Sequence, residues 1–297
     1  MLTIKKLSEC KLDEALIAWN SGFEGYYFDA SMDVDRFFAR FGLENLSPSL
    51  SIIAFDGEKP VGILLSGLKK INGKNIAWNG GTGVATAYRR IGVGKLLIDK
   101  AVDLYKEADV EISTLEALSE NTRAIKLYEQ KGYKKVDEVI HLRNDVVPEF
   151  YGSQDYQAIY TSAHDAQFFS MYQTDTPWQS QWFSMKEGQA LQLIDSEGKT
   201  VAYGLFKRQF DADGTLKSVI VTHCYVREDV SVNNNLIDSL FSHLFPPSIT
   251  NYECTVAFFL ISNKRIYHYL LEKGFTRKVN QVWMKRLVKE GVKMYGS

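Results

Sequence analysis

The sequence predicts an α/β protein made of two similar halves. The chain has 297 residues, more than the ~100–200 residues of a usual domain, so two domains are expected. Strand-like and helix-like apolar patterns alternate through the first half, and their order recurs in the second. We therefore expect one domain over residues 1–147 and another over residues 148–297.

The first half opens with short strand and helix patterns. Residues 2–6 predict a strand, and residues 12–20 carry apolar side chains at helical spacing. A second helix is expected over residues 33–41. Two β-rich runs around an Asp-Gly pair in residues 51–65 predict a hairpin.

The rest of the first half alternates strands with helices. Residues 76–84 predict a strand, and residues 94–107 predict an amphipathic helix. A strand over 110–118, a helix over 121–131 and a strand over 133–142 complete the unit. This order predicts a sheet with helices packed on it.

The turn before the helix 94–107 has the pattern Arg89-x-x-Gly92-x-Gly94. Glycines let the backbone of this turn approach a ligand closely, and the glycines of strand 76–84 would do the same for that strand. The first N–H groups of a helix lack partners and face a positive macrodipole end, so such a turn can hold a pyrophosphate. The glycine and lysine spacings of Rossmann and P-loop sites are both absent.

A second pattern lies downstream, Asn121-x-x-Ala-x-x-Leu-Tyr128-x-x-x-Gly-Tyr. The two patterns, in this order and at this separation, resemble the Gcn5-related N-acetyltransferase (GNAT) superfamily over about residues 1–145. One departure is Thr86, where the family often has proline. The resemblance implies a GNAT-like domain, which is a mixed, mostly antiparallel twisted sheet flanked by helices.

The resemblance also implies acetyl-CoA as cosubstrate and no metal. Backbone groups at the end of strand 76–84 would pair with the pantetheine arm and the thioester oxygen, and they belong to Thr82, Gly83 and Val84. The pyrophosphate loop would comprise Arg89, Arg90, Ile91, Gly92, Val93, Gly94 and Lys95. Asn121 would cap its helix and contact the pantetheine, and a capping role alone fits it equally well.

Two side chains are candidates for the chemistry. Tyr128 matches the family tyrosine placed near the sulfur and would be the general acid for the thiolate; an aromatic core residue is the alternative. Glu116 keeps the spacing of a base in acetyltransferases that modify ribosomal-protein N-termini. Ala117-Leu118 stands where those enzymes have Val-Arg, which weakens a ribosomal target. A structural or substrate-orienting role for Glu116 is the other interpretation.

The acceptor is expected to enter beside the first two helices. This region is rich in aromatic side chains, with acids among them, and would suit an amine on an apolar or aromatic body of a small molecule or peptide. Core packing is the alternative for about half of the aromatics. The residues are Trp19, Phe23, Tyr26, Tyr27 and Phe28, with Glu24 and Asp29.

The second half repeats the first at nearly constant offsets. Val61 is matched by Val201, and Asn121 is matched by Asn263. Leu236-Ile237-Asp238 likewise matches Leu97-Ile98-Asp99, and the separation within each of these pairs is nearly the same. A second GNAT-like domain is therefore predicted over residues 148–297.

The chemistry of this repeat is degenerate. Glu228, Ser231 and Asn233 stand where the first half has its loop arginine and glycines, and Leu270 stands where it has Tyr128. We expect a catalytic first domain and a degenerate second one. An aromatic segment over residues 168–182 would cover the acceptor cleft or form a subunit interface, which leaves a homodimer open.

Composition excludes several classes of protein. Lys and Arg total 35 and Asp and Glu total 36, giving a net charge of −1 that favours neither nucleic acid nor an acidic membrane. Cys10, Cys224 and Cys254 fit neither a disulfide framework nor a zinc pattern. Signal-peptide and membrane-spanning patterns are absent, so a cytoplasmic protein is expected.

These observations favour an acetyl-CoA-dependent N-acetyltransferase that acts by direct transfer in a ternary complex. The alternative is a non-catalytic acyl-CoA-binding sensor or a structural partner protein. Glu116, Asn121 and Tyr128 are all present in the first half, whereas the second half has lost part of this set. That asymmetry favours the enzyme.

Overall fold

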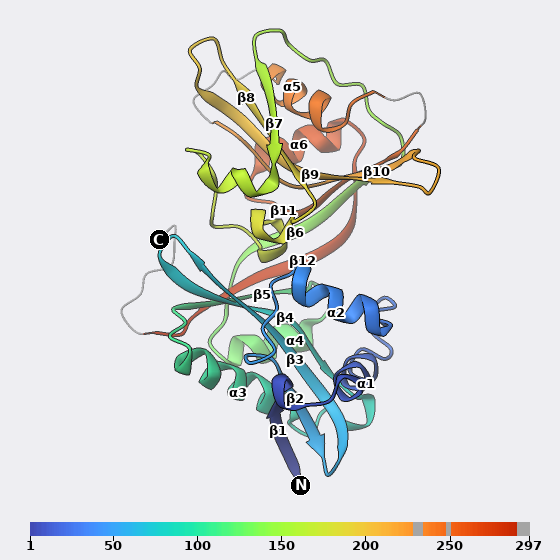
Figure 1. Ribbon diagram of the computed structural model, residues 1–297, viewed down its shortest axis with the longest axis vertical. Coiled ribbons are helices and arrows are strands. Elements are labelled where there is room, and N and C mark those ends of the chain that lie inside the picture. Colours follow the sequence, from blue (N-terminus) through green and yellow to red (C-terminus); the bar gives the residue numbers. More distant parts are fainter. Residues whose placement is uncertain (228–233, 248–250, 290–297) are drawn as a thin grey trace. The chain divides into compact units, whose positions relative to one another are not determined.

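The computed structural model describes residues 1–227, 234–247 and 251–289. The chain forms two compact units (Figure 1). Unit 1 is Met1–Val136 together with the chain from Trp283 onward, and unit 2 is Asp137–Val282. The units are therefore not consecutive halves divided at residue 147, because the end of the chain belongs to unit 1. Which unit is catalytic stays a prediction.

Unit 1 is a mixed sheet flanked by helices. Its strand order is β1-β2-β3-β4-β5, followed by the last residues of β12. Strands β1 to β4 pair antiparallel, and β4 pairs with β5 in parallel. The elements are β1 (Leu2–Lys6), α1 (Leu12–Gly22), α2 (Val34–Leu43), β2 (Ile52–Asp56), β3 (Lys59–Ile71), β4 (Lys74–Val84), α3 (Val93–Glu107), β5 (Ile112–Leu118) and α4 (Thr122–Gln130).

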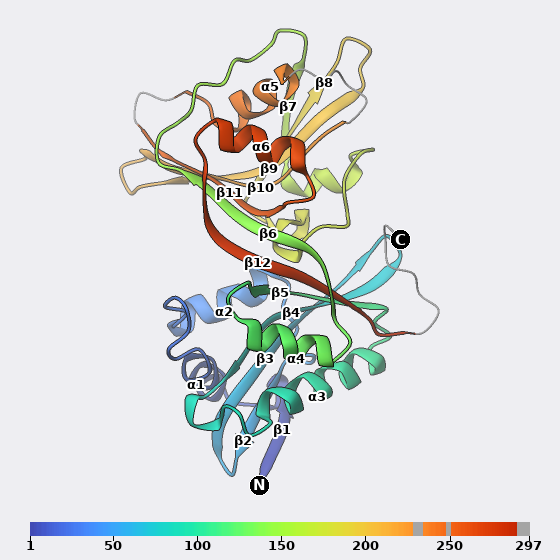
Figure 2. The same cartoon turned by 180° about the vertical axis from the view of Figure 1, so that it is seen from behind.

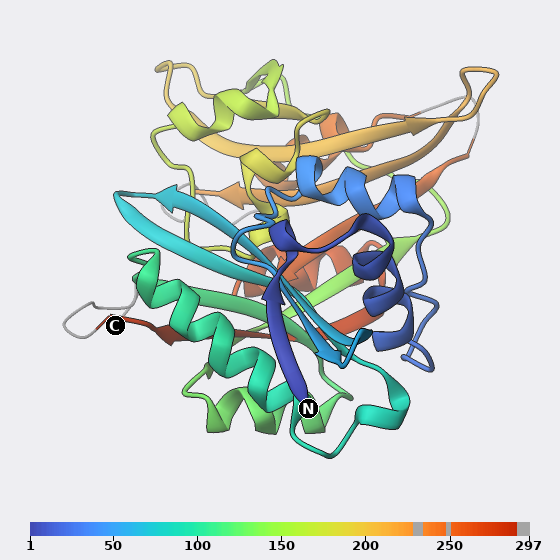
Figure 3. The same cartoon turned by 60° about the horizontal axis from the view of Figure 1, so that its bottom comes forward.

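Helices α1 and α3 cover opposite faces of this sheet. Successive strand residues point to opposite faces. In β4, Gly83 lies against the end of α1, whereas Val84 lies beside Gly94 of α3. Figure 3 shows strands β3 and β4 running between α1 (dark blue) and α3 (teal), and Figure 2 shows α3 and α4 together on one side. Both faces of the strand are thus buried.

Helix α1 packs unusually close to β4. A Cβ atom added to Gly83 would lie 2.8 Å from the Phe23 ring, and one added to Gly81 would lie 2.9 Å from the Trp19 ring. A Cβ on Gly22 would lie 2.9 Å from the carbonyl carbon of Gly83. Gly81 and Gly83 are therefore needed for the close approach of α1 and the residue that follows it, whereas the approach of a ligand to this backbone stays a prediction.

We expect Gly83→Ala to lower the free energy of unfolding by about 1–3 kcal/mol, because the added methyl group overlaps the Phe23 ring. Gly42→Ala is the matched control. Gly42 lies in α2 with open space around its Cβ position, so alanine should stabilise by about 0.5–1 kcal/mol. Urea unfolding measures both, and equal stability of the two variants would contradict the packing argument.

Unit 2 has the same kind of sheet. Its strand order is β6-β11-β10-β9-β8-β7, with β10 and β11 parallel and the other pairs antiparallel. Figure 2 shows α5 and α6 together on one face. The elements are β6 (Lys134–Asn144), β7 (Gln157–Ser162), β8 (Gln189–Ile194), β9 (Thr200–Phe210), β10 (Leu216–Val226), α5 (Asn235–Leu244), β11 (Glu253–Leu260), α6 (Lys264–Glu272) and β12 (Thr276–Leu287).

The two units share an irregularity where their parallel strand pairs end. The pairing of β4 with β5 ends at Asn79, and the pairing of β10 with β11 ends at Val221. A register shift follows in each case, at Gly80 in β4 and at Thr222 in β10. Two tandem domains of one fold are thus confirmed. Glu228, Ser231 and Asn233 lie outside the described residues.

Strands β6 and β12 are each divided between the units. The part of β6 from Val139 to Asn144 pairs with β11 in unit 2. The end of β12 neighbours β5 in unit 1, and the amide of Val288 donates to the carbonyl of Glu111 at 2.9 Å. Each sheet therefore contains a strand from the other half of the sequence. In the described part of the chain, no helix combines the length and apolarity that a membrane crossing requires.

Two buried histidines of unit 2 predict acid sensitivity. Burial lowers the pKa of His141 and of His223 from the usual 6.5 to about 4, so both are neutral when folded. Unfolding lets both bind protons once the pH is below about 6.5. Stability is therefore full above that pH and is lost as the pH falls through about 4.

We expect a loss of about 2–3 kcal/mol per histidine across this window. His223→Gln should reduce the pH dependence of urea unfolding, whereas the exposed His268→Gln should not. The same pH profile for His223→Gln and the unchanged protein would contradict this assignment.

Candidate active site

The candidate site begins where β4 leaves β5. The parallel pairs run from Ile76 with Ile112 to Asn79 with Leu115, and β4 then continues to Val84 beside β3. A register shift at Gly80 marks the divergence, and Gly81 has φ 149°. Among the described strands, residues 81–84 pair only with β3, so one edge of this backbone faces the opening between β4 and β5. Thr82, Gly83 and Val84 of the sequence prediction lie in this stretch.

The predicted phosphate loop is a turn with two left-handed residues. Arg90 has φ 71° and Gly92 has φ 96°, and α3 begins at Val93. The first hydrogen bond of the helix runs from the amide of Leu96 to the carbonyl of Gly92 at 3.0 Å. The amides of residues 93–95 therefore have no acceptor within the helix. A Cβ on Gly92 would meet open space. The turn can therefore receive an anion at the positive end of α3.

The cations of the loop have different surroundings. Arg89 donates from Nε to the carbonyl of Val84 at 2.8 Å, and from Nη2 to the carbonyls of Gly22 at 3.2 Å and Glu24 at 2.7 Å. Its guanidinium thus links the end of α1 to the loop by hydrogen bonds, a structural role that the sequence did not predict. Arg90 and Lys95 are the exposed cations of the turn. A phosphate contact of Arg89 stays a prediction.

The side chain of Tyr128, on helix α4, reaches the point where β4 diverges from β5. It is 7% exposed, and burial raises the pKa of its phenol. Hydrogen bonds with the side chains of Thr82 and Asn79 oppose that shift. The Asn79 amide also donates to Thr82 Oγ1 at 2.9 Å. A neutral phenol is therefore held in a polar cluster at the bulge of β4.

Asn79 is a site residue that the sequence analysis missed. Besides its bond to Thr82, its Oδ1 accepts from the amide of Gly81 at 3.1 Å, which fixes the bulge. The signal that could have found it is a polar residue, 5% exposed, in the middle of an apolar strand. Such a residue needs buried partners.

The loop after α1 covers the start of α4. Asn121 caps this helix, since its Oδ1 accepts from the amide of Ala124 at 3.2 Å. Its side chain also hydrogen-bonds to Tyr26, whose phenol pKa is raised by burial. Tyr27 Oη donates to the carbonyl of Glu120 at 3.2 Å. Two tyrosines of the predicted acceptor region therefore lie beside two predicted site residues, Asn121 and Tyr128.

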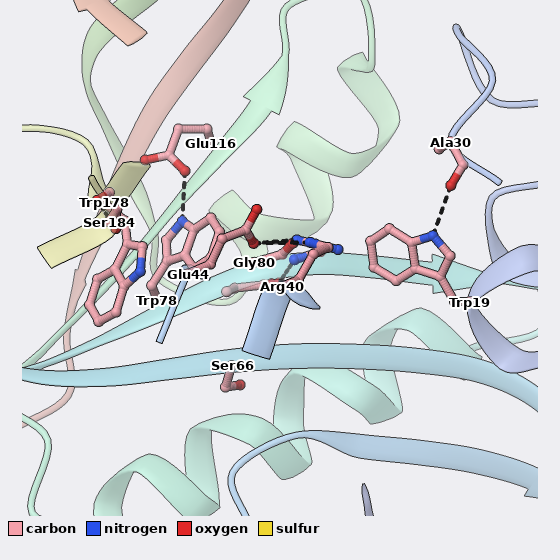
Figure 4. Close-up of polar contacts among 12 residues, drawn as sticks. Trp19, Ala30, Arg40, Glu44, Ser66, Trp78, Gly80, Glu116, Trp178 and Ser184 are labelled. Atoms are coloured by element: carbon pink, nitrogen blue, oxygen red, sulfur yellow. Dashed lines mark hydrogen bonds and ion pairs between the residues drawn. The ribbon is translucent and has the colours of Figure 1, made fainter. Parts of the chain in front are cut away.

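Glu116 faces an indole. Trp78 Nε1 donates to Glu116 Oε2 at 2.7 Å (Figure 4). Glu116 is half-buried, while its neighbours on β5 are buried. On the same part of β4, the carbonyl of Gly80 accepts from Arg40 at 2.9 Å, and Arg40 pairs with Glu44 at 2.7 Å. The carboxylate is thus oriented by a fixed donor.

The aromatic region divides into a core and an exposed part. Trp19 is 4% exposed and donates to the carbonyl of Ala30 at 2.9 Å (Figure 4). The ring centroids of Phe23 and Trp19 lie 4.2 Å apart, with the two rings tilted by 31°. Tyr27 and Phe28 are each 57% exposed. The inner aromatics are therefore core, and the outer ones remain available to an acceptor. Within the described residues, no cluster of three or more His, Cys, Asp or Glu side chains could hold a metal ion.

Comparison with known proteins agrees with this geometry. Residues 13–133 match the model of the acetyltransferase (GNAT) family. No curated protein matches the chain in sequence. A GCN5-related N-acetyltransferase from Sphaerobacter thermophilus has a similar structure, with TM-score 0.64, 14% identity, and coverage of 99% of this chain and 98% of that chain.

Two further solved structures are similar over nearly the full length. A tandem GNAT protein from the clavulanic acid biosynthesis pathway gives TM-score 0.63, 12% identity, and coverage of 98% of this chain and all of that chain. A putative acetyltransferase from Pyrococcus horikoshii gives TM-score 0.61, 12% identity, and coverage of 98% and 91%. At these identities the structures establish the fold. Residues 13–133 therefore match the acetyltransferase (GNAT) family, and the chain as a whole has the fold of tandem GNAT proteins.

Proposed function

We propose that the protein is an acetyl-CoA-dependent N-acetyltransferase that moves the acetyl group to a primary amine by direct transfer in a ternary complex. The observation that carries this proposal is the neutral Tyr128 phenol held by Thr82 and Asn79 where β4 leaves β5. The acceptor would be a small molecule or peptide. A cytoplasmic setting without nucleic-acid or membrane partners remains part of the proposal.

The residues present fit the cosubstrate. The open space at Gly92 and the free helix start of α3 suit a pyrophosphate, with Arg90 and Lys95 supplying charge. The unpaired edge of β4 from Gly81 to Val84 suits the pantetheine amides. Backbone donors there would also stabilise negative charge on the thioester oxygen. Acetyl-CoA, when bound, supplies the activated acetyl thioester.

Two side chains of the protein would accept and donate the protons of the reaction. Glu116 would accept a proton from the amine through water, while Trp78 holds its other oxygen. The nitrogen forms its bond to the acetyl carbon as the carbon–sulfur bond breaks. Tyr128 would donate its proton to the departing sulfur, and solvent would restore it. A phenol whose pKa burial has raised keeps that proton at neutral pH.

The test is release of free thiol from acetyl-CoA across a panel of amines, polyamines, aminoglycosides, amino acids and N-terminal peptides. Release with one acceptor class would support the enzyme and identify its substrate. If no acceptor in the panel causes thiol release although acetyl-CoA still binds, transfer to these acceptors is contradicted. The sensor or structural-partner function would then be favoured.

A further inference from the structure

Unit 2 contains a cavity at the place that corresponds to the candidate active site. The cavity has a volume of about 500 Å³ and lies between the ends of β10 and β11 and the start of α6. Residues 173–180 form its remaining wall. This volume is within the range of sites for small organic molecules, roughly 300–1,000 Å³.

The cavity lacks the reactive groups of unit 1. When Asn263 is aligned with Asn121, Phe258 and Leu270 occupy the positions of Glu116 and Tyr128. Burial raises the pKa of the Cys224 thiol to about 12, so it is not a thiolate nucleophile. Burial also keeps His223 neutral, and its Nε2 lies 3.1 Å from Tyr203 Oη. This cavity is therefore built for binding without chemistry.

One end of the cavity suits an anion. Asn263 makes no side-chain capping bond, in contrast to Asn121, and the first intrahelical bond runs from the amide of Tyr267 to the carbonyl of Asn263 at 3.0 Å. The amide of Ile266, a residue that lines the cavity, thus comes before the first intrahelical acceptor.

A buried hydroxyl adds a second, independent signal. Thr222 lines the cavity at the bulge of β10 and is 6% exposed. Within the described part of the chain, its Oγ1 has no hydrogen-bond partner. An unsatisfied buried hydroxyl is costly, and a ligand atom would satisfy it.

The charge of the lining sets the charge of the ligand. Lys264 and Arg265 bring two positive charges, and Asp175 brings one negative charge. The balance of one positive charge matches a single negative group better than a diphosphate. The wall that β11 supplies is apolar, with Phe258, Phe259 and Leu260.

We propose that unit 2 binds, without transforming it, a small organic acid that has one anionic group and an apolar or aromatic body. A carboxylate and a monophosphate ester share this chemistry. The anionic group would lie at the start of α6 beside Lys264 and Thr222, and the body would lie against the β11 wall. This binding does not depend on the transferase activity proposed for unit 1.

Calorimetric titration of the full-length protein tests the proposal with three probes. We expect saturable binding of 3-phenylpropionate or phenyl phosphate, and at least tenfold weaker binding of neutral 3-phenylpropanol. The preferred anion identifies the carboxylate or phosphate source. Equal affinity for the neutral alcohol would overturn the anionic assignment, and no binding of either anion would overturn the proposal.

Matched variants locate the binding. Lys264→Gln and Thr222→Val should each weaken the preferred anion about tenfold. Lys199→Gln, which removes an exposed lysine from a turn, should not. Unchanged affinity in both cavity variants, with folding confirmed by urea unfolding, would place the ligand elsewhere.

A last experiment distinguishes anion binding in the unit 2 cavity from anion binding in unit 1. In Gly92→Asp, anion affinity should equal that of the unchanged protein, because Gly92 lies on the α3 turn of unit 1. Anion binding lost in this variant would assign the ligand to unit 1. Coenzyme A binding that displaces the anion in the Gly92→Asp protein would show that the cavity is a second coenzyme site, and would overturn the proposal.

Discussion

Replacing Tyr128 by phenylalanine is expected to lower turnover about a hundredfold, while the affinity for acetyl-CoA changes less than about twofold. The phenol is held by Thr82 and Asn79 at the divergence of β4 and β5, where it would protonate the leaving sulfur. Phenylalanine keeps the ring and removes only the proton donor. Steady-state thiol release and equilibrium binding measure the two quantities.

The matched control is Tyr105→Phe. Tyr105 is also a buried phenol of unit 1, and its Oη lies 2.8 Å from Ser66 Oγ. Removing this hydroxyl tests the loss of a buried hydrogen bond without touching the divergence. Native turnover in Tyr128→Phe would exclude the general-acid role, and an equal loss in Tyr105→Phe would show a structural effect only.

Gly92→Asp is expected to weaken acetyl-CoA binding about a hundredfold. Gly92 has φ 96°, and its Cβ position faces open space where the pyrophosphate would lie. Aspartate therefore adds both bulk and negative charge toward the ligand, with backbone strain of about 1–2 kcal/mol. Titration calorimetry with acetyl-CoA gives the change in affinity.

Two control variants separate the effect of the added charge from the effects of added bulk and of position. Gly92→Asn has nearly the same size and a similar tolerance of left-handed backbone but carries no charge, so it should bind better than Gly92→Asp. Gly57→Asp places an acid at another left-handed glycine with open surroundings, in the turn between β2 and β3, and should bind normally. Unchanged affinity in Gly92→Asp would mean that the phosphate loop lies elsewhere.

Local patterns predicted the elements of unit 1 well. The hairpin of β2 and β3 and the start of α3 near Gly94 follow from turn chemistry and apolar periodicity, which act between residues close in sequence. The capping role of Asn121 is confirmed by its bond to the amide of Ala124. The roles of Tyr128 and Glu116 in catalysis stay predictions.

Long-range contacts could not be predicted. Arg89 donates to carbonyls of Gly22 and Glu24, which lie far earlier in the sequence, and a backbone acceptor has no sequence signature. The packing of Trp19 and Phe23 against Gly81 and Gly83 was not predicted either, because a side chain from a distant helix is equally invisible in a local pattern. The unsatisfied hydroxyl of Thr222 likewise emerges only once its surroundings are folded.

The division of β12 between the units has a consequence for biosynthesis. The strand neighbour of β5 comes from the chain that begins at Trp283, so the first unit cannot complete its sheet until synthesis has passed that residue. Until then β5 offers an open edge on which another nascent chain could pair. A fragment that stops at residue 147 keeps that open edge permanently, so it should aggregate where the full chain stays dispersed.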